Sequence, residues 1–186
     1  MSRGRPVWVR PSTIAPPDFL RDVEKVAKTL KSQAGVTGHH IDGTNNPNIR
    51  VSTVKFLDPY EHVDINRFVY DAVHRVNAEF FGFDITATQV MQHTTYKKGH
   101  HYKPHVDVFW ETDENTPQFD RKLSVSLLLS DPADFEGGDL VIDGQQIDLK
   151  KGEMVIFPSY IFHEVLPVKK GIRKSLVAWI WGQRWR

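Results

Sequence analysis

Two stretches in the first half of the chain repeat their apolar residues at helical spacing. The first covers residues 18–31 and begins at Asp18, a good N-cap residue after two prolines. The second covers residues 64–81 and keeps one apolar face over its whole length. Between the two lie a polar loop at residues 35–48 and a strand-like run at residues 50–57. The first half therefore predicts two helices and one strand.

After residue 84 the pattern changes to short apolar runs separated by turn residues. Asp143-Gly144 lies between two such runs and predicts a tight hairpin. Many strands after two helices favour a mainly β, α+β fold, a sandwich or jelly roll with the N-terminal helices packed on one face. We expect a single domain over residues 1–186, with helical support in 1–84 and the β core in about 85–182. The predicted strands are residues 85–96, 123–129, 139–142, 154–157, 161–167 and 172–181.

Composition narrows the chemistry of this domain. The 186 residues contain no cysteine, which excludes disulfides, thiolate metal sites and cysteine nucleophiles. The formal net charge of +1 argues against nucleic acid or an anionic membrane as partner. No apolar run has the length of a membrane span, and no leader pattern is visible, so a cytoplasmic location is the default expectation. The oligomeric state has no signature in the sequence.

His105-Val106-Asp107 is the first candidate for chemistry. On a strand, residues i and i+2 point to the same face, so an imidazole and a carboxylate converge there. His163, between apolar strand residues, is placed to supply a third ligand. Two histidines and one carboxylate leave positions open on a metal, which suits iron(II) binding a bidentate cosubstrate and O₂. The other histidines are expected on the surface or in loops: His39, His40, His62, His74, His93, His100 and His101.

Arg173 and Ser175 follow His163 across a predicted turn at residues 167–171. A hairpin there places Arg173 beside the strand of His163, where its guanidinium can hold a carboxylate through two hydrogen bonds. Ser175 lies on the same strand face and can add a third hydrogen bond. The alternative is a basic turn, residues 169–174, that only solvates a hairpin.

Together these residues resemble one known family. Tyr96-x-x-Gly99-x-x-Tyr102-x-x-His105-x-Asp107, Gly137-Gly138-x-Leu140, Phe157-Pro158-Ser159, His163-Glu164-Val165-x-Pro167-Val168-x-x-Gly171-x-Arg173-x-Ser175 and Trp179 are similar to the prolyl 4-hydroxylase group of iron(II)- and 2-oxoglutarate-dependent oxygenases, in its small stand-alone bacterial and phage forms. The likeness covers about residues 85–182 and is weaker in the helical half.

The resemblance implies a double-stranded β-helix, a jelly roll of the cupin kind, with iron(II) at its mouth. It implies metal ligation by His105, Asp107 and His163, and binding of the distal carboxylate of 2-oxoglutarate by Arg173. Tyr96 then lies near the cosubstrate and Tyr102 lines the substrate entrance, although both could equally be packing residues. The implied reaction is hydroxylation by O₂ of a prolyl residue in a peptide or protein, with decarboxylation of 2-oxoglutarate to succinate and support from ascorbate.

The acceptor is the open question. Residues 35–48 and 108–118 are polar segments of the kind that cover clefts, and we expect them to close over an extended peptide. Arg50 and Glu111 are candidates to contact that peptide, but placement at the surface is favoured. One rival is the same chemistry on a free amino acid or other small molecule, and another is a metal-binding cupin without oxygenase activity. A methylated base is disfavoured, because Trp179 stands where repair-type oxygenases have a second arginine.

Overall fold

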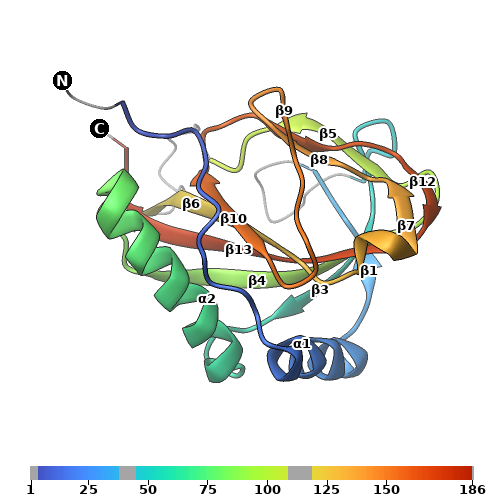
Figure 1. Cartoon of the computed structure of the whole chain (residues 1–186), viewed down its shortest axis with the longest axis horizontal. Helices are drawn as coiled ribbons and strands as arrows, with labels where there is room; N and C mark the ends of the chain where they lie inside the picture. The colour runs from blue at the N-terminus through green and yellow to red at the C-terminus, as the bar shows by residue number, and fades with distance from the viewer. Residues whose placement is uncertain (1–3, 38–44, 109–118, 186) are drawn as a thin grey trace.

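A computed structural model describes residues 4–37, 45–108 and 119–185 of the protein. Two helices lie in the first half of the chain. Helix α1 (Pro17–Thr29) and helix α2 (Val63–Val76) with its terminal π-helical turn η1 (Asn77–Phe81) occupy the predicted stretches. Both lie beneath the larger β-sheet (Figure 1). Asp18 is not the N-cap as predicted: Pro16 caps the helix, and Asp18 lies in the first turn, where its carboxylate favours the positive end of the helix dipole.

Two large antiparallel sheets face each other above the helices (Figure 1). The six-stranded sheet has the order β1 (Gln33–Ala34), β3 (Thr53–Leu57), β4 (Ala87–Tyr96), β13 (Arg173–Gln183), β6 (Phe119–Leu128), β10 (Met154–Pro158). The five-stranded sheet has the order β2 (Arg50–Val51), β5 (His101–His105), β11 (His163–Val165), β8 (Leu140–Ile142), β9 (Gln145–Ile147). The 3₁₀ turn η2 (Pro132–Asp134) precedes β7 (Phe135–Gly137), which pairs with β12 (Val168–Gly171). The predicted mainly β fold, a double-stranded β-helix with N-terminal helices, is confirmed.

Two predicted elements differ from the structure. The run at residues 50–57 is two strands, because β2 pairs with β5 in one sheet while β3 pairs with β4 in the other. Residues 168–171 form strand β12 rather than a turn. Consequently Arg173 begins a strand of the six-stranded sheet, and it faces His163 from the opposite sheet instead of flanking it.

Strand β13 separates the apolar core from the site. Its alternate residues Leu176, Ala178 and Ile180 pack in the core cluster that includes buried residues of both helices. The intervening residues, which include Arg173 and Ser175, line a cavity between the two sheets. The two-residue period of the strand thus places core residues on one face of the sheet and cavity-lining residues on the other.

The predicted hairpin at Asp143-Gly144 is confirmed between β8 and β9. Both residues have positive φ, 49° and 73°, as a type I′ turn requires. None of the described helices is long and apolar enough to cross a membrane.

His93 is a further correction, because it is 4% exposed rather than at the surface. It lies on the helix-facing side of β4, where its Nε2 is 3.2 Å from Glu24 Oε1 of α1. Lys174 Nζ donates to the other oxygen of Glu24 at 2.8 Å. The hydrogen bond from His93, followed by Lys174, outweighs burial and lowers the pKa of Glu24 to about 2. These contacts link α1 to the six-stranded sheet. Two other histidines expected at the surface or in loops, His39 and His40, lie outside the described residues.

Candidate active site

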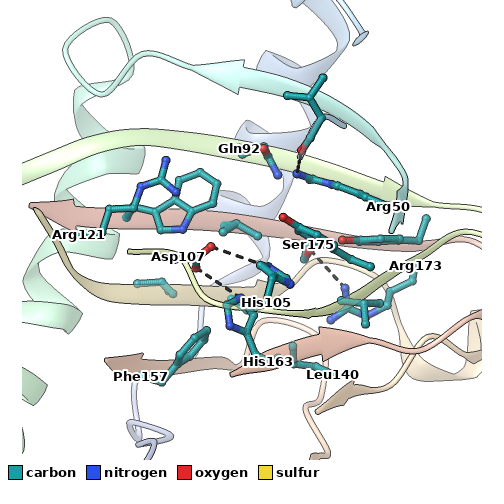
Figure 2. Close-up of a pocket in the computed structure, with 18 of the residues that line it drawn as sticks. Arg50, Gln92, His105, Asp107, Arg121, Leu140, Phe157, His163, Arg173 and Ser175 are labelled. Carbon is teal, nitrogen blue, oxygen red and sulfur yellow. Dashed lines mark hydrogen bonds and ion pairs between the residues drawn. The ribbon is translucent and has the colours of Figure 1, made fainter. Parts of the chain in front are cut away.

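His105, Asp107 and His163 meet in the cavity, between Arg121 on one side and Arg173 on the other (Figure 2). Strand pairing sets the two histidines opposite each other, since His105 at the end of β5 is in register with His163 at the start of β11. One ligand atom from each of the three residues lies within 4.8 Å of the others. Asp107 is 3.9 Å from His105 Nε2 through Oδ1 and 3.4 Å from His163 Nε2 through Oδ2. The structure therefore brings the three predicted ligands together.

The route by which Asp107 arrives differs from the predicted one. Strand β5 ends at His105, so strand alternation does not carry Asp107 to the same face. Instead, its backbone N–H donates to the carbonyl of Ser159 at 2.8 Å, in the segment between β10 and β11. The aspartate is thus positioned by the chain that leads into the His163 strand.

The protonation pattern of the imidazoles suits metal binding. Nδ1 of His105 lies 2.8 Å from the carbonyl of Lys103, and Nδ1 of His163 lies 3.0 Å from the carbonyl of Ile161. A carbonyl only accepts, so each Nδ1 carries the hydrogen and each Nε2 presents its lone pair. Burial, and then repulsion by His163, lowers the pKa of His105 and keeps it in the neutral form that binds metals.

Asp107 is held as an oriented carboxylate. Burial by itself raises its pKa, but the charges of His163, His105 and Arg121, with a hydrogen bond from Ser124, outweigh it, so the pKa lies below its ordinary value. Ser124 Oγ donates to Asp107 Oδ2 at 2.7 Å and lies 2.9 Å from Ser159 Oγ. Two imidazoles that present Nε2 and one carboxylate form a nitrogen and oxygen donor set that fits iron(II).

Arg173 lies across the cavity from this cluster. It is 3% exposed, and Nη1 donates to Ser175 Oγ at 3.3 Å. Among the residues that the structure describes, no carboxylate forms an ion pair with it. Burial lowers the pKa of Arg173, because the charged form loses hydration. A buried guanidinium without an ion-pair partner in contact is costly, which makes this wall of the cavity suited to bind an anion.

Gly137-Gly138 makes room for this arginine. Gly138 has φ +69°, and a Cβ there would lie 3.2 Å from Arg173 Cδ and 2.7 Å from Val168 Cγ2. Only glycine combines this backbone conformation with such close packing. Gly138 of the motif is therefore required because a side chain there would displace Arg173 and Val168.

The two predicted tyrosines also line the cavity, which has a volume of about 180 Å³. The Tyr102 ring stacks on His105 with centroids 3.4 Å apart. Tyr96 is buried, and the Arg173 guanidinium lies 5.9 Å from its ring centroid. Burial raises the pKa of both phenols, to about 12 for Tyr102, so both stay protonated hydrogen-bond donors at neutral pH.

Two further arginines line the cavity, one that the sequence analysis favoured at the surface and one that it did not name. Arg50, expected at the surface, is 7% exposed and lines the cavity. Arg121 lines it from the other side of the triad (Figure 2), hydrogen-bonded to Gln89 at 2.7 Å and stacked 4.1 Å from the Trp179 centroid. Most of the two segments expected to close over a peptide, with Glu111, lies outside the described residues.

With the site described, sequence comparison shows which known proteins it resembles. Residues 91–181 match the model of the 2OG-Fe(II) oxygenase superfamily. A PKHD-type hydroxylase of Paraburkholderia xenovorans is 36% identical over 89 residues, which cover 46% of this chain and 39% of that protein. A PKHD-type hydroxylase of Psychrobacter is 38% identical over 92 residues and matched over 36% of its length. The chain thus spans well under half the length of these relatives.

Solved structures agree on the fold. A prolyl-4-hydroxylase of Pseudomonas putida superposes with TM-score 0.69 at 22% identity, covering 96% of this chain and 94% of that one. The viral collagen prolyl hydroxylase of Paramecium bursaria Chlorella virus-1, solved with 2OG, gives TM-score 0.71 at 19% identity, covering 95% and 97%. Residues 91–181 are thus similar to the 2OG-Fe(II) oxygenase superfamily, and the described structure has the fold of these prolyl hydroxylases with a His-Asp-His cluster. Within that superfamily the chain resembles the prolyl 4-hydroxylase group.

Proposed function

We propose that the protein is an iron(II)- and 2-oxoglutarate-dependent dioxygenase that hydroxylates a prolyl residue in a peptide or protein. One observation carries this proposal: a buried cluster of two histidines and an aspartate shares a cavity with Arg173, a buried cation that has no anionic partner among the described residues. That pairing matches a cosubstrate with a metal-chelating end and a carboxylate at the other.

His105, Asp107 and His163 hold the metal, and their backbone and serine hydrogen bonds fix the orientation of each ligand. When bound, iron(II) supplies the activation of O₂ that is coupled to decarboxylation of 2-oxoglutarate to succinate.

The cosubstrate is held by the opposite wall. Arg173 binds its distal carboxylate, and Ser175, hydrogen-bonded to that guanidinium, adds a hydroxyl beside it. Tyr96 presents a protonated phenol to the same region. Apolar side chains such as Phe157 and Leu140 line the cavity and limit water around the reacting groups. Fixing the cosubstrate at both ends restricts it to one pose.

A peptide acceptor is supported by the two structural neighbours, a prolyl-4-hydroxylase and a collagen prolyl hydroxylase. Tyr102 is proposed to line the entrance for that acceptor. A free amino acid is the alternative acceptor, whereas a cupin without oxygenase activity is not favoured by the family match. A single catalytic domain over residues 1–186, support by ascorbate and a cytoplasmic location stay predictions.

The test is to incubate the protein with iron(II), ascorbate, 2-oxoglutarate and proline-containing peptides. Mass spectrometry should find one added oxygen on proline, with one succinate released for each hydroxylation. Asp107→Ala should stop both products, while Arg75→Gln, an exposed change on α2, serves as the control for handling and folding. Succinate release that persists in Asp107→Ala would show that the metal ligands are misassigned. Oxygen added to a residue other than proline would reject the prolyl acceptor.

A further inference from the structure

Arg50 is a buried cation whose role the proposed cosubstrate pocket does not explain. Its guanidinium sits 4.5 Å from the ring centroid of Tyr102 and lines the metal cavity. Nε donates to Ser52 Oγ at 2.9 Å, and Nη1 donates to the carbonyl of Val36 at 3.1 Å. A Cβ on Gly35 would collide with both Ser52 Oγ and Arg50 Nε, so glycine is needed for this position. The side chain is therefore fixed rather than free to fold out to solvent.

These contacts leave donors of Arg50 unused. A guanidinium has five N–H groups. The hydroxyl of Ser52, the carbonyl of Val36 and the phenol of Tyr96 account for at most three of them. Throughout residues 4–37, 45–108 and 119–185, no carboxylate forms an ion pair with Arg50. A buried charge in this state is stabilised strongly by an anion that enters the cavity.

Charge counting separates Arg50 from the cosubstrate. In the proposed complex, the two charges of iron(II) and the single charge of Arg173 are balanced by the dianion 2-oxoglutarate and by Asp107. Arg121 is engaged with Gln89 and Trp179 on the far side of the triad (Figure 2). The dianion and Asp107 therefore leave the positive charge of Arg50, which lines the same cavity, without a balancing anion.

The surroundings of Arg50 indicate the kind of acceptor. Val36 and Phe56 line the same cavity and are 44% and 40% exposed, so the rim beside the cation is apolar. Resting on the proposed function, we propose that Arg50 binds a carboxylate of the acceptor while its apolar part lies against Val36 and Phe56. The carboxylate is either an acidic side chain next to the hydroxylated proline or the terminal α-carboxylate of that proline.

Matched acceptors test this assignment. One pair of fluorescent peptides carries Glu or Gln beside a central proline, and a second pair ends in proline as the free acid or the amide. Binding is measured by anisotropy on the protein loaded anaerobically with iron(II) and 2-oxoglutarate, and hydroxylation is measured by mass spectrometry. One pair should show an acid preference of about 10- to 100-fold, as expected for hydrogen bonds to a charged group. The pair that shows it identifies the source of the carboxylate.

Variants assign the preference to one side chain. Arg50→Gln should bring the acid preference close to one, and Arg50→Lys should keep part of it, while Arg75→Gln should keep all of it. The change in acceptor KM should exceed the change in 2-oxoglutarate KM at least about tenfold, consistent with loss of a charged hydrogen bond. Equal binding of acid and amide by the wild type overturns the proposal even if Arg50→Gln fails to fold. An effect confined to 2-oxoglutarate KM also overturns it and assigns Arg50 to the cosubstrate.

This proposal can fail separately from the proposed function. Succinate released from 2-oxoglutarate in the absence of acceptor, and lost in Asp107→Ala, supports the oxygenase chemistry. Absence of any acid preference, with that succinate release intact, rejects the role of Arg50 alone.

Discussion

Replacing Ser124 by alanine tests how the site holds its aspartate. Ser124 Oγ is fully buried and donates to Asp107 Oδ2 at 2.7 Å. Removing the hydroxyl leaves the fold of β6 intact, because the side chain is small and points at the site rather than into the apolar core. The carboxylate then loses a charge-assisted hydrogen bond within a buried environment, and it is free to turn away from the metal position.

The size of the effect follows from that contact. A hydrogen bond to a charged group contributes about 1.5–3 kcal/mol. Loss of a hydrogen bond to a metal ligand typically weakens metal binding by about 10- to 100-fold, which agrees with that energy at about 1.4 kcal/mol per factor of ten. We therefore expect the Kd of Ser124→Ala for iron(II) to rise by about 10- to 100-fold.

Isothermal titration with iron(II) under argon measures this Kd. Ser126→Ala is the matched control, because Ser126 is on the same strand and lines the cavity, yet the structure records no hydrogen bond from it to the triad. An unchanged Kd in Ser124→Ala, or an equal loss in both variants, would show that the hydroxyl of Ser124 does not orient Asp107.

Three further predictions test other parts of the account. Arg173→Lys removes the two-pronged donor and should raise the apparent KM for 2-oxoglutarate about 10-fold or more in a succinate assay; an unchanged KM contradicts its role. The hydrogen bond from His93, ahead of the nearby lysine, lowers the pKa of Glu24 from 4.5 to about 2. That stabilisation is complete above pH 4.5 and fades as pH falls towards 2, so Glu24→Gln should cost ~1–2 kcal/mol at pH 7 after allowance for solvent, with the difference closing in acid denaturation curves. Gly171 has φ +74° and lies against the backbone of residues 134 and 135, so Gly171→Ala should lower the free energy of unfolding by roughly 2–4 kcal/mol. Gly144→Ala is the control, because Gly144 has φ +73° but an added Cβ would meet open space, and it should cost about 1–2 kcal/mol. Equal urea midpoints for the two variants would contradict this.

The sequence predicts what depends on local periodicity. Two helices and most strands of the second half appear where apolar spacing places them, and the turn at Asp143-Gly144 follows from turn chemistry. The triad was also predictable, although the reason for the convergence of His105 and Asp107 was not. Strand alternation suggested it, whereas a backbone hydrogen bond to Ser159 produces it.

Arg121 was missed because its orientation depends on pairing between distant strands. Ile180 of β13 pairs with Leu123 of β6, and the next residue of β13, Trp181, pairs with Arg121. Lys122 of β6 is therefore an extra residue without a partner in the pairing of the two strands. This bulge reverses the alternation and turns Arg121 towards the cavity. Simple alternation from Leu123 places it on the helix-facing side instead.

Arg50 and His93 were misplaced for a related reason. Composition assigns charged and imidazole side chains to the surface, which is correct on average. Arg50 is buried because a two-residue strand pairs with β5 and sets it over Tyr102, and His93 is buried because Glu24 of α1 supplies a partner. Both partners are distant in sequence, so no local signal identifies them.

The most direct test is an anaerobic titration of the protein with iron(II) and 2-oxoglutarate, followed by visible absorption. A ferrous ion held by His105, Asp107 and His163 and chelated by the cosubstrate should give a metal-to-ligand charge-transfer band. The band should saturate at one iron per chain and be lost in Asp107→Ala. A wild-type protein that stays colourless, or a band that survives in Asp107→Ala, would contradict the assignment of the site.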